Sequence, residues 1–391
     1  MRRIENEKGR LYMNIPFLDL KAQQGLILDE IKERFDDIFS NTGFILGKHV
    51  AEFEKDFSRI QEAKFTLGVS SGTDALHVAL LALGVGPGDE VVVPVNTFIA
   101  TAEAVSHCGA IPLFADCDRF YNMDVDELEE ILRGEKTRRP EGRKNSRVKA
   151  VIPVHLYGQP ADMSKIMAIS DKYGADVVED ACQAHLARYN GKSVGTFGQF
   201  GCFSFYPGKN LGAFGEAGAV VTDDEGLYDR ARLFRQHGET EKYNHKVIGH
   251  NYRMAALQGA VLSTKLKYIK RWTESRQKNA RLYNERLKDI EGIETPFEPE
   301  GTSPVYHLYV IQADNRDELK KYLEEKGILS GLHYPVPLHL QEAYGFLGYK
   351  KGDFPFAEKT AKRILSLPMY PELTEEQIDY VCSSIKDFLK Q

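Results

Sequence analysis

The chain has 391 residues, of which 42% are hydrophobic and 28% are charged, so its length allows two or three globular domains. Its formal net charge is −6, and this acidic balance gives no overall attraction to nucleic acid or to an anionic membrane surface. We therefore expect neither nucleic acid nor a membrane as a partner.

The cysteines and the N-terminal segment indicate the compartment. The five cysteines are widely spaced and form no CxxC pair, which is typical of a reducing environment and not of a zinc site or a disulfide framework. Residues 1–14 are charged and lack the apolar core of a signal peptide, so we expect a disordered tail there. No later apolar run reaches membrane-spanning length. These observations favour a cytoplasmic protein.

From Phe65 onward, short β-branched runs alternate with longer amphipathic ones. The expected strands cover 65–69, 89–95, 110–116, 149–158, 175–181, 199–207 and 217–224. Helices that begin after polar caps and end at glycine separate most of them, which predicts the α/β class with a mostly parallel central sheet flanked by helices. The last two runs are too close for a crossover helix, so they are either antiparallel or separated by a longer excursion.

Beyond about Leu257 the pattern changes to long, charged helices. Residues 261–290 have apolar positions at helical spacing with basic residues between them, which indicates a connecting helix. A strand over 305–313 and later helices then predict a smaller C-terminal α+β domain. We expect three parts, namely a tail over 1–14, a large domain over 15–257, and the connecting helix with the small domain over 258–391.

A basic insertion, GEKTRRPEGRKNSRVK, covers 134–149. It is compatible with a patch for a phosphorylated ligand and, more simply, with a lengthened surface loop, so we assign no site to it.

One lysine, Lys209, lies among glycines in FSFYPGKNLGAFGEAGAVV, 203–221. The segment does not match the GxxxxGK[ST] phosphate loop of nucleoside triphosphatases, and its glycines run as GxxGxxG into a strand, unlike a dinucleotide fingerprint. A lysine that forms a Schiff base must be desolvated or placed near positive charge, and a planar aldehyde must approach its backbone closely. Neighbouring glycines permit that approach.

The other requirements of pyridoxal phosphate have candidates in the same chain. A carboxylate must face the pyridine nitrogen, and Glu179 and Asp180 end an apolar strand, although a helix cap would also explain an acid there. A helix N-terminus suits the phosphate, and Gly72 and Thr73 occupy a strand–turn–helix junction that is alternatively only a well-capped helix. Ser204 adds a hydroxyl, and Phe98 is either a ring partner or a core residue.

In this order the motifs resemble those of the pyridoxal-phosphate-dependent nucleotide-sugar aminotransferases of the DegT/DnrJ type. The resemblance extends over nearly the whole chain from Ile15. It rests on IPFLDLKAQQ, SSGTDALHVALLALGVGPGDEVVVPVNTFIAT, VIPVHLYGQPADM, VVEDACQAH, SFYPGKNLGAFGEAGA, GHNYRMAALQGAVL and LHYPVPLHLQEAY. It implies the aspartate-aminotransferase-like fold, known as fold type I, with pyridoxal phosphate as cofactor and its pyridoxamine form as an intermediate.

The resemblance also implies roles for single residues. Lys209 would form the internal aldimine, Asp180 would pair with the ring nitrogen, Phe98 would stack on the ring, and Gln183 would lie near the phenolic oxygen. Phosphate contacts would come from Gly72, Thr73 and Ser204, with Asn251 reaching across from a second subunit, so the active unit would be a homodimer with composite sites. Arg253, His333 and Tyr334 match positions that contact the sugar nucleotide in the family, although a structural role is a rival for the last two.

The resemblance further implies a ping-pong transamination from L-glutamate to a nucleotide-linked keto-sugar. Lysine, and not the histidine of related dehydratases, stands at position 209 and favours transamination. The form PGKNLGAFGEAGA is most similar to members that aminate C3 of a dTDP-linked 3-keto-6-deoxyhexose, while Glu216 departs from their pattern. Alternatives are a C4 aminotransferase, an aminotransferase for UDP-sugars, other keto-sugars or cyclitols, and a sensor that binds pyridoxal phosphate without catalysis.

Overall fold

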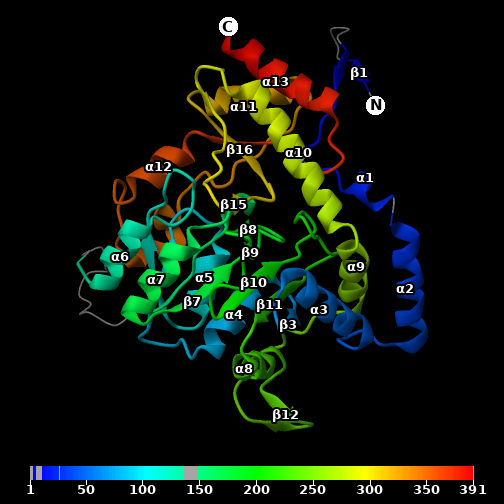
Figure 1. Cartoon of the computed structure of the whole chain (residues 1–391), viewed down its shortest axis with the longest axis vertical. Helices are drawn as coiled ribbons and strands as arrows, with labels where there is room; N and C mark the ends of the chain where they lie inside the picture. The colour runs from blue at the N-terminus through cyan, green and yellow to red at the C-terminus, as the bar shows by residue number, and fades with distance from the viewer. Residues whose placement is uncertain (1–2, 6–10, 26, 136–147, 391) are drawn as a thin grey trace.

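The computed structural model describes residues 3–5, 11–25, 27–135 and 148–390 (Figure 1). A seven-stranded sheet crosses the middle of the molecule. In spatial order its strands are β3 (Phe65–Val69), β11 (Gly218–Thr222), β10 (Phe200–Ser204), β7 (Asp176–Asp180), β6 (Val148–Val151), β4 (Glu90–Pro94) and β5 (Ile111–Ala115). Only β11 runs antiparallel to its neighbours in this sheet. The predicted α/β fold with a mostly parallel sheet is confirmed. Of the two alternatives left open for its last two strands, the structure shows the antiparallel pairing.

Helices cover the two faces of this sheet. They are α3 (Lys48–Gln61), α4 (Gly72–Ala82), α5 (Ala100–His107), α6 (Val125–Arg133), α7 (Met163–Tyr173) and α8 (Glu225–Arg235). Helix α4 lies against β7, β10 and β11, whereas α3 lies against β3. Successive side chains of β10 serve both faces, because Cys202 joins the core beneath α4 and Phe203 joins the core beneath α3.

The predicted connecting helix over 261–290 is two helices, α9 (Ala256–Leu266) and α10 (Ile269–Leu287). Helix α9 packs on α3 and on α2 (Leu28–Asn41), so the predicted domain boundary after residue 257 falls inside a helix of the larger unit. We propose to divide the chain between α9 and α10 instead.

The C-terminal part is built on a small antiparallel sheet. Its strands are β14 (Ile293–Glu294), β16 (Tyr309–Ala313) and β17 (Ile364–Leu367), and its helices are α11 (Arg316–Glu325), α12 (Pro355–Ala361) and α13 (Glu375–Leu389). One face of α10 attaches to the segment after β17. Buried Arg276, Asn279 and Tyr283 donate hydrogen bonds to the carbonyls of Met369, Tyr370 and Pro368, respectively, at 2.8, 3.0 and 3.1 Å. These bonds satisfy a run of buried carbonyls that no strand pairs.

The N-terminal segment belongs to the C-terminal core. Ile15 is fully buried there, its N–H donates to the Gly327 carbonyl at 2.8 Å, and its carbonyl accepts from Leu329 N–H at 3.0 Å. Within the tail predicted over 1–14, β1 (Arg3–Glu5) and β2 (Leu11–Met13) form an antiparallel pair, which differs from the expected disorder, and residues 1–2 and 6–10 lie outside the described residues. Helix α1 (Leu20–Gln24) then leads towards α2.

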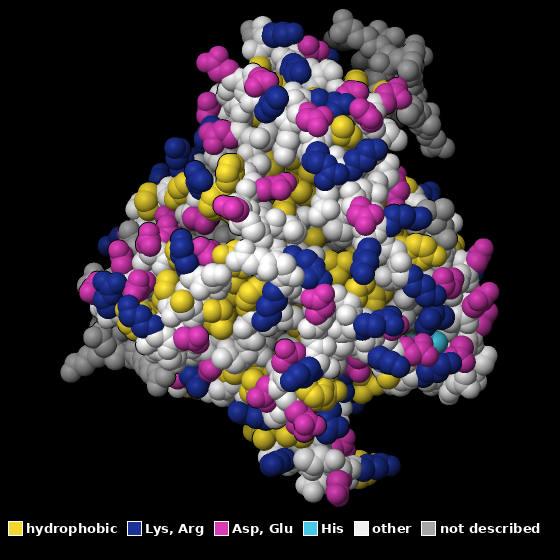
Figure 2. Space-filling model, viewed as in Figure 1, with side chains coloured by type: hydrophobic (Ala, Val, Ile, Leu, Met, Phe, Trp, Pro, Cys, Tyr) yellow, Lys and Arg dark blue, Asp and Glu magenta, His cyan; other side chains and the backbone are white. Residues whose placement is uncertain are grey.

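Two small sheets of short strands complete the described structure. One is a three-stranded sheet in which β8 (Arg188–Tyr189) lies between β15 (Thr302–Ser303) and β9 (Lys192–Ser193). The other is the hairpin of β12 (Glu239–Glu241) and β13 (Asn244–His245). Figure 1 shows this hairpin projecting at the end of the molecule opposite the two termini. On the face drawn in Figure 2, acidic and basic side chains are interspersed.

Two further expectations concern the basic insertion and membrane-spanning segments. The interior of the basic insertion, 136–147, lies outside the described residues. Among the helices of the described ranges, none has both the length and the apolar character needed to cross a bilayer.

Candidate active site

A cavity of about 790 Å³ lies at the carboxyl ends of the parallel strands, between the central sheet and the C-terminal part. Nine of the eleven predicted site residues line it: Gly72, Thr73, Phe98, Asp180, Gln183, Ser204, Lys209, His333 and Tyr334. They come from α4, β7, β10 and the loops between elements. The structure therefore brings together residues separated by more than 260 positions in the sequence.

One end of the cavity is suited to an anion. Ser71 caps α4, its hydroxyl accepting from Asp74 N–H at 3.0 Å and its carbonyl from Ala75 N–H at 3.0 Å, so the main-chain N–H groups of Gly72 and Thr73 stay available to a ligand. A Cβ atom at Gly72 would lie 2.6 Å from Ser204 Cβ. Position 72 therefore requires glycine, and its backbone approaches Ser204 closely.

Two adjacent carboxylates at the end of β7 have different surroundings, because successive side chains of a strand point to opposite faces. The side chain of Asp180 lines the cavity, accepting from the Thr101 hydroxyl at 2.8 Å and from Cys182 N–H at 3.2 Å. Glu179 is fully buried on the other side. Asp180 is therefore the acid of this pair that can meet a ligand.

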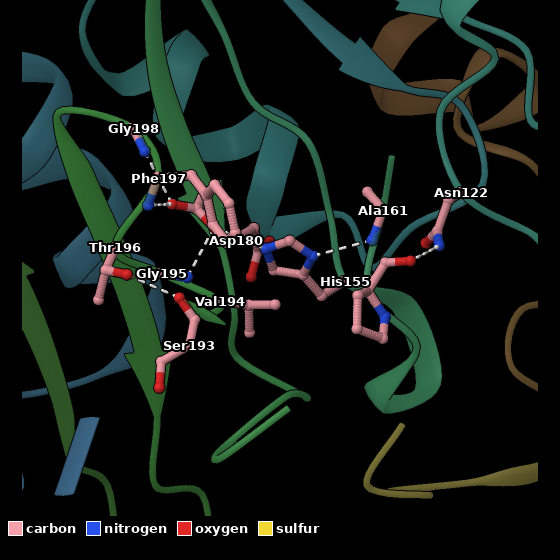
Figure 3. A network of polar contacts seen from close by, with 12 residues as sticks. Asn122, His155, Ala161, Asp180, Ser193, Val194, Gly195, Thr196, Phe197 and Gly198 are labelled. Atoms are coloured by element: carbon pink, nitrogen blue, oxygen red, sulfur yellow. Dashed lines mark hydrogen bonds and ion pairs between the residues drawn. The ribbon is translucent and has the colours of Figure 1, made fainter. Parts of the chain in front are cut away.

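Glu179 instead organises a turn beneath the site. Its Oε1 accepts from Phe197 and Gly198 N–H at 2.6 and 2.9 Å, and its Oε2 accepts from Gly195 N–H and from His155 Nε2 at 2.6 and 3.0 Å. His155 Nδ1 accepts from Ala161 N–H at 3.1 Å, so the ring is the neutral tautomer with its proton on Nε2 (Figure 3).

This network predicts a stability loss for Glu179→Gln. The amide nitrogen would face main-chain N–H donors that now bind an oxygen, and leaving a buried donor unsatisfied costs about 1–3 kcal/mol. We expect the free energy of unfolding of the apoprotein, measured in urea, to fall by about this amount. Asp180→Asn is the matched control, because an amide can still accept from Cys182 N–H and donate to Thr101. Equal losses in both variants would contradict the assignment.

Lys209 lies half-buried in the cavity wall. Burial lowers the pKa of its amine below the ordinary value of 10.5, and the nearby Asp180 opposes this shift. Burial also raises the pKa of the Cys182 thiol well above its ordinary value, so that group is a neutral neighbour. The amine is thus more readily available in its neutral, nucleophilic form than an exposed lysine would be.

An aromatic pair borders the opposite side of the cavity. The Phe98 side chain is 53% exposed, and its ring centroid lies 5.7 Å from that of Tyr334. Gln183 Nε2 donates to the Tyr334 hydroxyl at 3.2 Å, and its Oε1 accepts from Tyr157 N–H at 2.7 Å. Phe98 therefore presents an open ring face, whereas Gln183 is held in one amide orientation.

Several residues of the site were not predicted. Thr101 fixes Asp180 from 79 positions away, and Phe17, Glu216 and His307 also line the cavity. Phe17 stacks on His333 with centroids 5.6 Å apart. Phe17 belongs to the motif IPFLDLKAQQ, which indicated the family without indicating a role, and nothing local distinguishes Thr101 from other helical threonines.

The remaining two predicted residues, Asn251 and Arg253, do not line the cavity of their own chain. Asn251 is exposed, and its Oδ1 accepts from Arg253 Nη2 at 2.7 Å. They follow the β12–β13 hairpin and precede α9, where Val69 forms a bridge with Arg253.

The cavity fits pyridoxal phosphate by its donor set. It offers main-chain N–H groups and the Ser204 hydroxyl for a phosphate, the carboxylate of Asp180 for a pyridine nitrogen, the amine of Lys209 for an aldehyde, and the face of Phe98 for a ring. The absence of a side chain at Gly72 permits close backbone contact at the phosphate end, where a Cβ atom would clash with Ser204.

Comparison of the sequence with known proteins shows which family the chain belongs to. A sequence profile of the DegT/DnrJ/EryC1/StrS aminotransferase family matches residues 26–386. The chain is 45% identical over 97% of its length to a Geobacillus stearothermophilus "pleiotropic regulatory protein", covering 99% of that protein. It is 42% identical to the UDP-N-acetyl-3-dehydro-α-D-glucosamine 3-aminotransferase of Acidithiobacillus ferrooxidans, over 95% of this chain and 97% of that one. It is 40% identical to the dTDP-3-amino-3,4,6-trideoxy-α-D-glucose transaminase of Streptomyces venezuelae, over 96% and 97%.

Solved structures include similar folds. The structure of S. venezuelae DesV in complex with a ketimine intermediate superposes with a TM-score of 0.91 at 39% identity, covering 97% of this chain and 99% of that one. Bacillus subtilis NtdA with bound pyridoxamine phosphate superposes with a TM-score of 0.88 at 30% identity, covering 98% and 87%. The expected fold type I is therefore confirmed.

Proposed function

Because the chain belongs to the DegT/DnrJ/EryC1/StrS aminotransferase family, we propose that it moves the amino group of L-glutamate to C3 of a dTDP-linked 3-keto-6-deoxyhexose. The protein is a sugar aminotransferase, and its cofactor is pyridoxal phosphate. The observation that carries the proposal is the shared cavity of Lys209, Asp180 and the N-terminus of α4. Glutamate becomes 2-oxoglutarate in one half-reaction, and the keto-sugar becomes an amino sugar in the other.

The bound cofactor supplies an electron sink that stabilises a carbanion next to the transferred nitrogen. In the proposal, Asp180 keeps the pyridine nitrogen protonated, and Thr101 holds this carboxylate in place. Lys209 Nζ takes up and returns the proton at the reacting carbon as general base and acid. Gly72, Thr73 and Ser204 would hold the phosphate, Phe98 would cover the ring, and Gln183 would serve the phenolic oxygen.

The choice of C3 is supported by the names of the relatives from A. ferrooxidans and S. venezuelae, which both place the amine at C3. These names differ in the nucleotide, UDP in one and dTDP in the other. The form PGKNLGAFGEAGA around Lys209 is the reason for preferring a dTDP-6-deoxyhexose. A C4 aminotransferase and an enzyme for UDP-sugars, other keto-sugars or cyclitols are the competing assignments.

A test of the substrate can use stable amino sugars in the reverse half-reaction. The holoprotein is mixed with dTDP-3-amino-3,6-dideoxy-α-D-galactose, its sugar 1-phosphate, the free amino sugar, a UDP-linked 3-amino sugar and a dTDP-linked 4-amino sugar, and the cofactor spectrum is followed. We expect the dTDP-linked compound to react at least about tenfold more efficiently than the others. A preference for the UDP-linked or 4-amino compound would overturn the substrate assignment and leave the aminotransferase.

A catalytically silent sensor is the non-enzymatic alternative, and one relative carries a regulatory name. The presence of Lys209 and Asp180 in one cavity argues against a protein that binds the cofactor without catalysis, since cofactor binding alone does not require a carboxylate fixed by Thr101. Excess L-glutamate should convert the cofactor spectrum of the wild type. A spectrum unchanged by glutamate and by every amino sugar would favour the sensor.

We also propose a homodimer with composite active sites. Among the described residues that line the cavity, Lys209 is the one lysine or arginine, whereas Asp180 and Glu216 contribute carboxylates. The proposed ligands carry a phosphate, a diphosphate and the carboxylates of glutamate, so the described lining residues supply too little positive charge to balance them. Asn251 and Arg253 of a second copy would supply the missing donors.

Exposed apolar side chains support such a partner. Tyr243 and Ile248, in and beside the hairpin, are 82% and 93% exposed. Phe44 and Ile45 are also exposed, next to the segment that follows Arg253, because Ala256 N–H donates to the Phe44 carbonyl at 2.9 Å. A second copy would cover these groups.

The cytoplasm is the proposed location. All five cysteines are free thiols, and four of them are buried, which fits a reducing compartment.

A further inference from the structure

A short turn links the two sides of the cavity without lining it. Leu156–Gly158 forms a single 3₁₀ turn, and Tyr157 within it has a φ of 60°, a conformation that side chains rarely adopt. Tyr157 is 6% exposed and does not line the cavity. Such a conformation persists where the surroundings hold the residue on several sides, and both polar ends of Tyr157 are indeed occupied.

The main-chain end of Tyr157 sets the direction of Gln183. Tyr157 N–H donates to Gln183 Oε1 at 2.7 Å, so that atom must be the oxygen of the amide and the other must be the nitrogen. Gln183 Nε2, a donor only, faces the Tyr334 hydroxyl at 3.2 Å. The Tyr334 oxygen accepts this bond, which leaves its own proton free to point elsewhere.

The side-chain end of Tyr157 holds the backbone that carries Tyr334. The Tyr157 hydroxyl donates to the carbonyl of His333, the residue immediately before Tyr334. One residue thus fixes Tyr334 from both directions, its hydroxyl through Gln183 and its backbone through His333.

The Tyr334 hydroxyl itself is a donor at neutral pH. Burial raises the pKa of Tyr334 above its ordinary value of 10, so the phenol keeps its proton. No acceptor for that proton is recorded among the described residues, and Tyr334 lines the cavity beside Phe98. The proton is therefore available to an oxygen of a ligand.

We propose that Tyr157 is a positioning residue that aims the hydroxyl of Tyr334 at the sugar of the amino acceptor. The inference rests on the proposed function, because it requires a sugar substrate in this cavity. In this proposal the contacts of the 156–158 turn serve the half-reaction of the sugar, and the half-reaction of glutamate does not depend on them. Tyr157 acts through Gln183 and His333 and touches no substrate.

The test compares Tyr157→Phe with Tyr121→Phe. Tyr121 is a close match, being 7% exposed, having a φ of 69° and lying 5.4 Å from Tyr157 between ring centroids. Its hydroxyl bonds to the Gln312 side chain, away from the 333–334 segment. Each half-reaction is measured by single-turnover spectra of the holoprotein, with L-glutamate in one and dTDP-3-amino-3,6-dideoxy-α-D-galactose in the other.

We expect Tyr157→Phe to lower kcat/KM for the amino sugar about tenfold, chiefly through KM, and to change the glutamate half-reaction less than about threefold. Tyr121→Phe should change neither. In the double variant Tyr157→Phe/Tyr334→Phe the loss should equal that of Tyr334→Phe alone, because the group being aimed is already gone. Losses that multiply, or equal losses in both half-reactions, would overturn the inference.

A second readout does not depend on turnover. Hydrogen exchange of the apoprotein is followed for the peptide containing 331–334. Tyr157→Phe should speed exchange there by about tenfold relative to Tyr121→Phe, since the segment loses its anchor. Unchanged exchange would overturn the positioning role even if the substrate proved to be different. If the wild type reacts with glutamate but with no sugar, while Tyr157→Phe speeds exchange of the 331–334 segment as expected, the substrate assignment alone would be refuted.

Discussion

Lys209→Ala is expected to abolish the visible band of the covalently bound cofactor and to lower transamination by about 10²–10⁴-fold. The wild type with pyridoxal phosphate should absorb at ~420 nm and shift towards ~330 nm with excess L-glutamate, whereas the variant should do neither. The physical reason is that a half-buried amine with a lowered pKa is both the attachment point and the proton carrier in the proposal. Absorption spectra and stopped-flow rates measure the two effects.

Lys265 offers a control for the loss of a buried lysine. Burial lowers its pKa to about 8, and its Nζ donates to the Gly212 carbonyl at 2.7 Å, but it does not line the cavity. Lys265→Arg should keep the band and its response to glutamate. A glutamate-dependent shift that survives in Lys209→Ala would refute the assigned role.

The same lowered pKa gives a direction for the dependence on pH. Attachment of the cofactor to the wild-type apoprotein needs the neutral amine, so its rate should fall as pH falls through the pKa of Lys209. Because that pKa lies below 10.5, the decline should begin at lower pH than for an exposed lysine. This profile is read from the same absorbance band.

Two inactive variants should restore activity when mixed, if the sites are composite. Lys209→Ala and Arg253→Ala each remove one component, but a mixed dimer would contain one site with Lys209 from one chain and Arg253 from the other. After random exchange of subunits, about a quarter of all sites would be intact, so about a quarter of wild-type activity should return. Activity is measured in the glutamate and amino-sugar half-reactions after the two proteins are incubated together.

The control mixture is Lys209→Ala with Asp180→Asn. These residues line the same cavity of one chain, so no mixed dimer would contain an intact site. Restoration in the control, or none in the test mixture, would contradict the composite site. The test is independent of the nucleotide that the enzyme prefers.

Much of the fold could be predicted from the sequence because the patterns that mark its main strands and helices are local. Periodicity predicted the strands that lead to the cavity, and the short connection before 217–224 allowed the antiparallel direction of β11 as one of two alternatives. Lys209 could be proposed because glycines on both sides are unusual around a lysine, and Gly72 because a strand, a turn and a helix follow in order. These signals lie within a few residues of the groups that they mark.

The rest depended on contacts between distant segments. The local residue pattern could not separate Glu179 from Asp180, and only the family resemblance did, since the register of β7 in the sheet decides which carboxylate faces the ligand. Thr101 and Tyr157 matter through partners 79 and 176 positions away. The break between α9 and α10 was not predicted from the sequence either, because apolar residues continue at helical spacing on both sides of Lys267.

The placement of Ile15 beside Ile328 has a consequence for how the protein is made. Phe17 and Leu18, close to the start of the chain, form one wall of the cavity, while His333, Tyr334 and Met369, near its end, form another. During synthesis the first wall must wait, unpaired, until more than 300 further residues have left the ribosome. The central sheet can assemble meanwhile from neighbouring segments. The cavity can therefore close only after the segment that carries His333 and Tyr334 has emerged, and a nascent chain cannot enclose a cofactor there before that point.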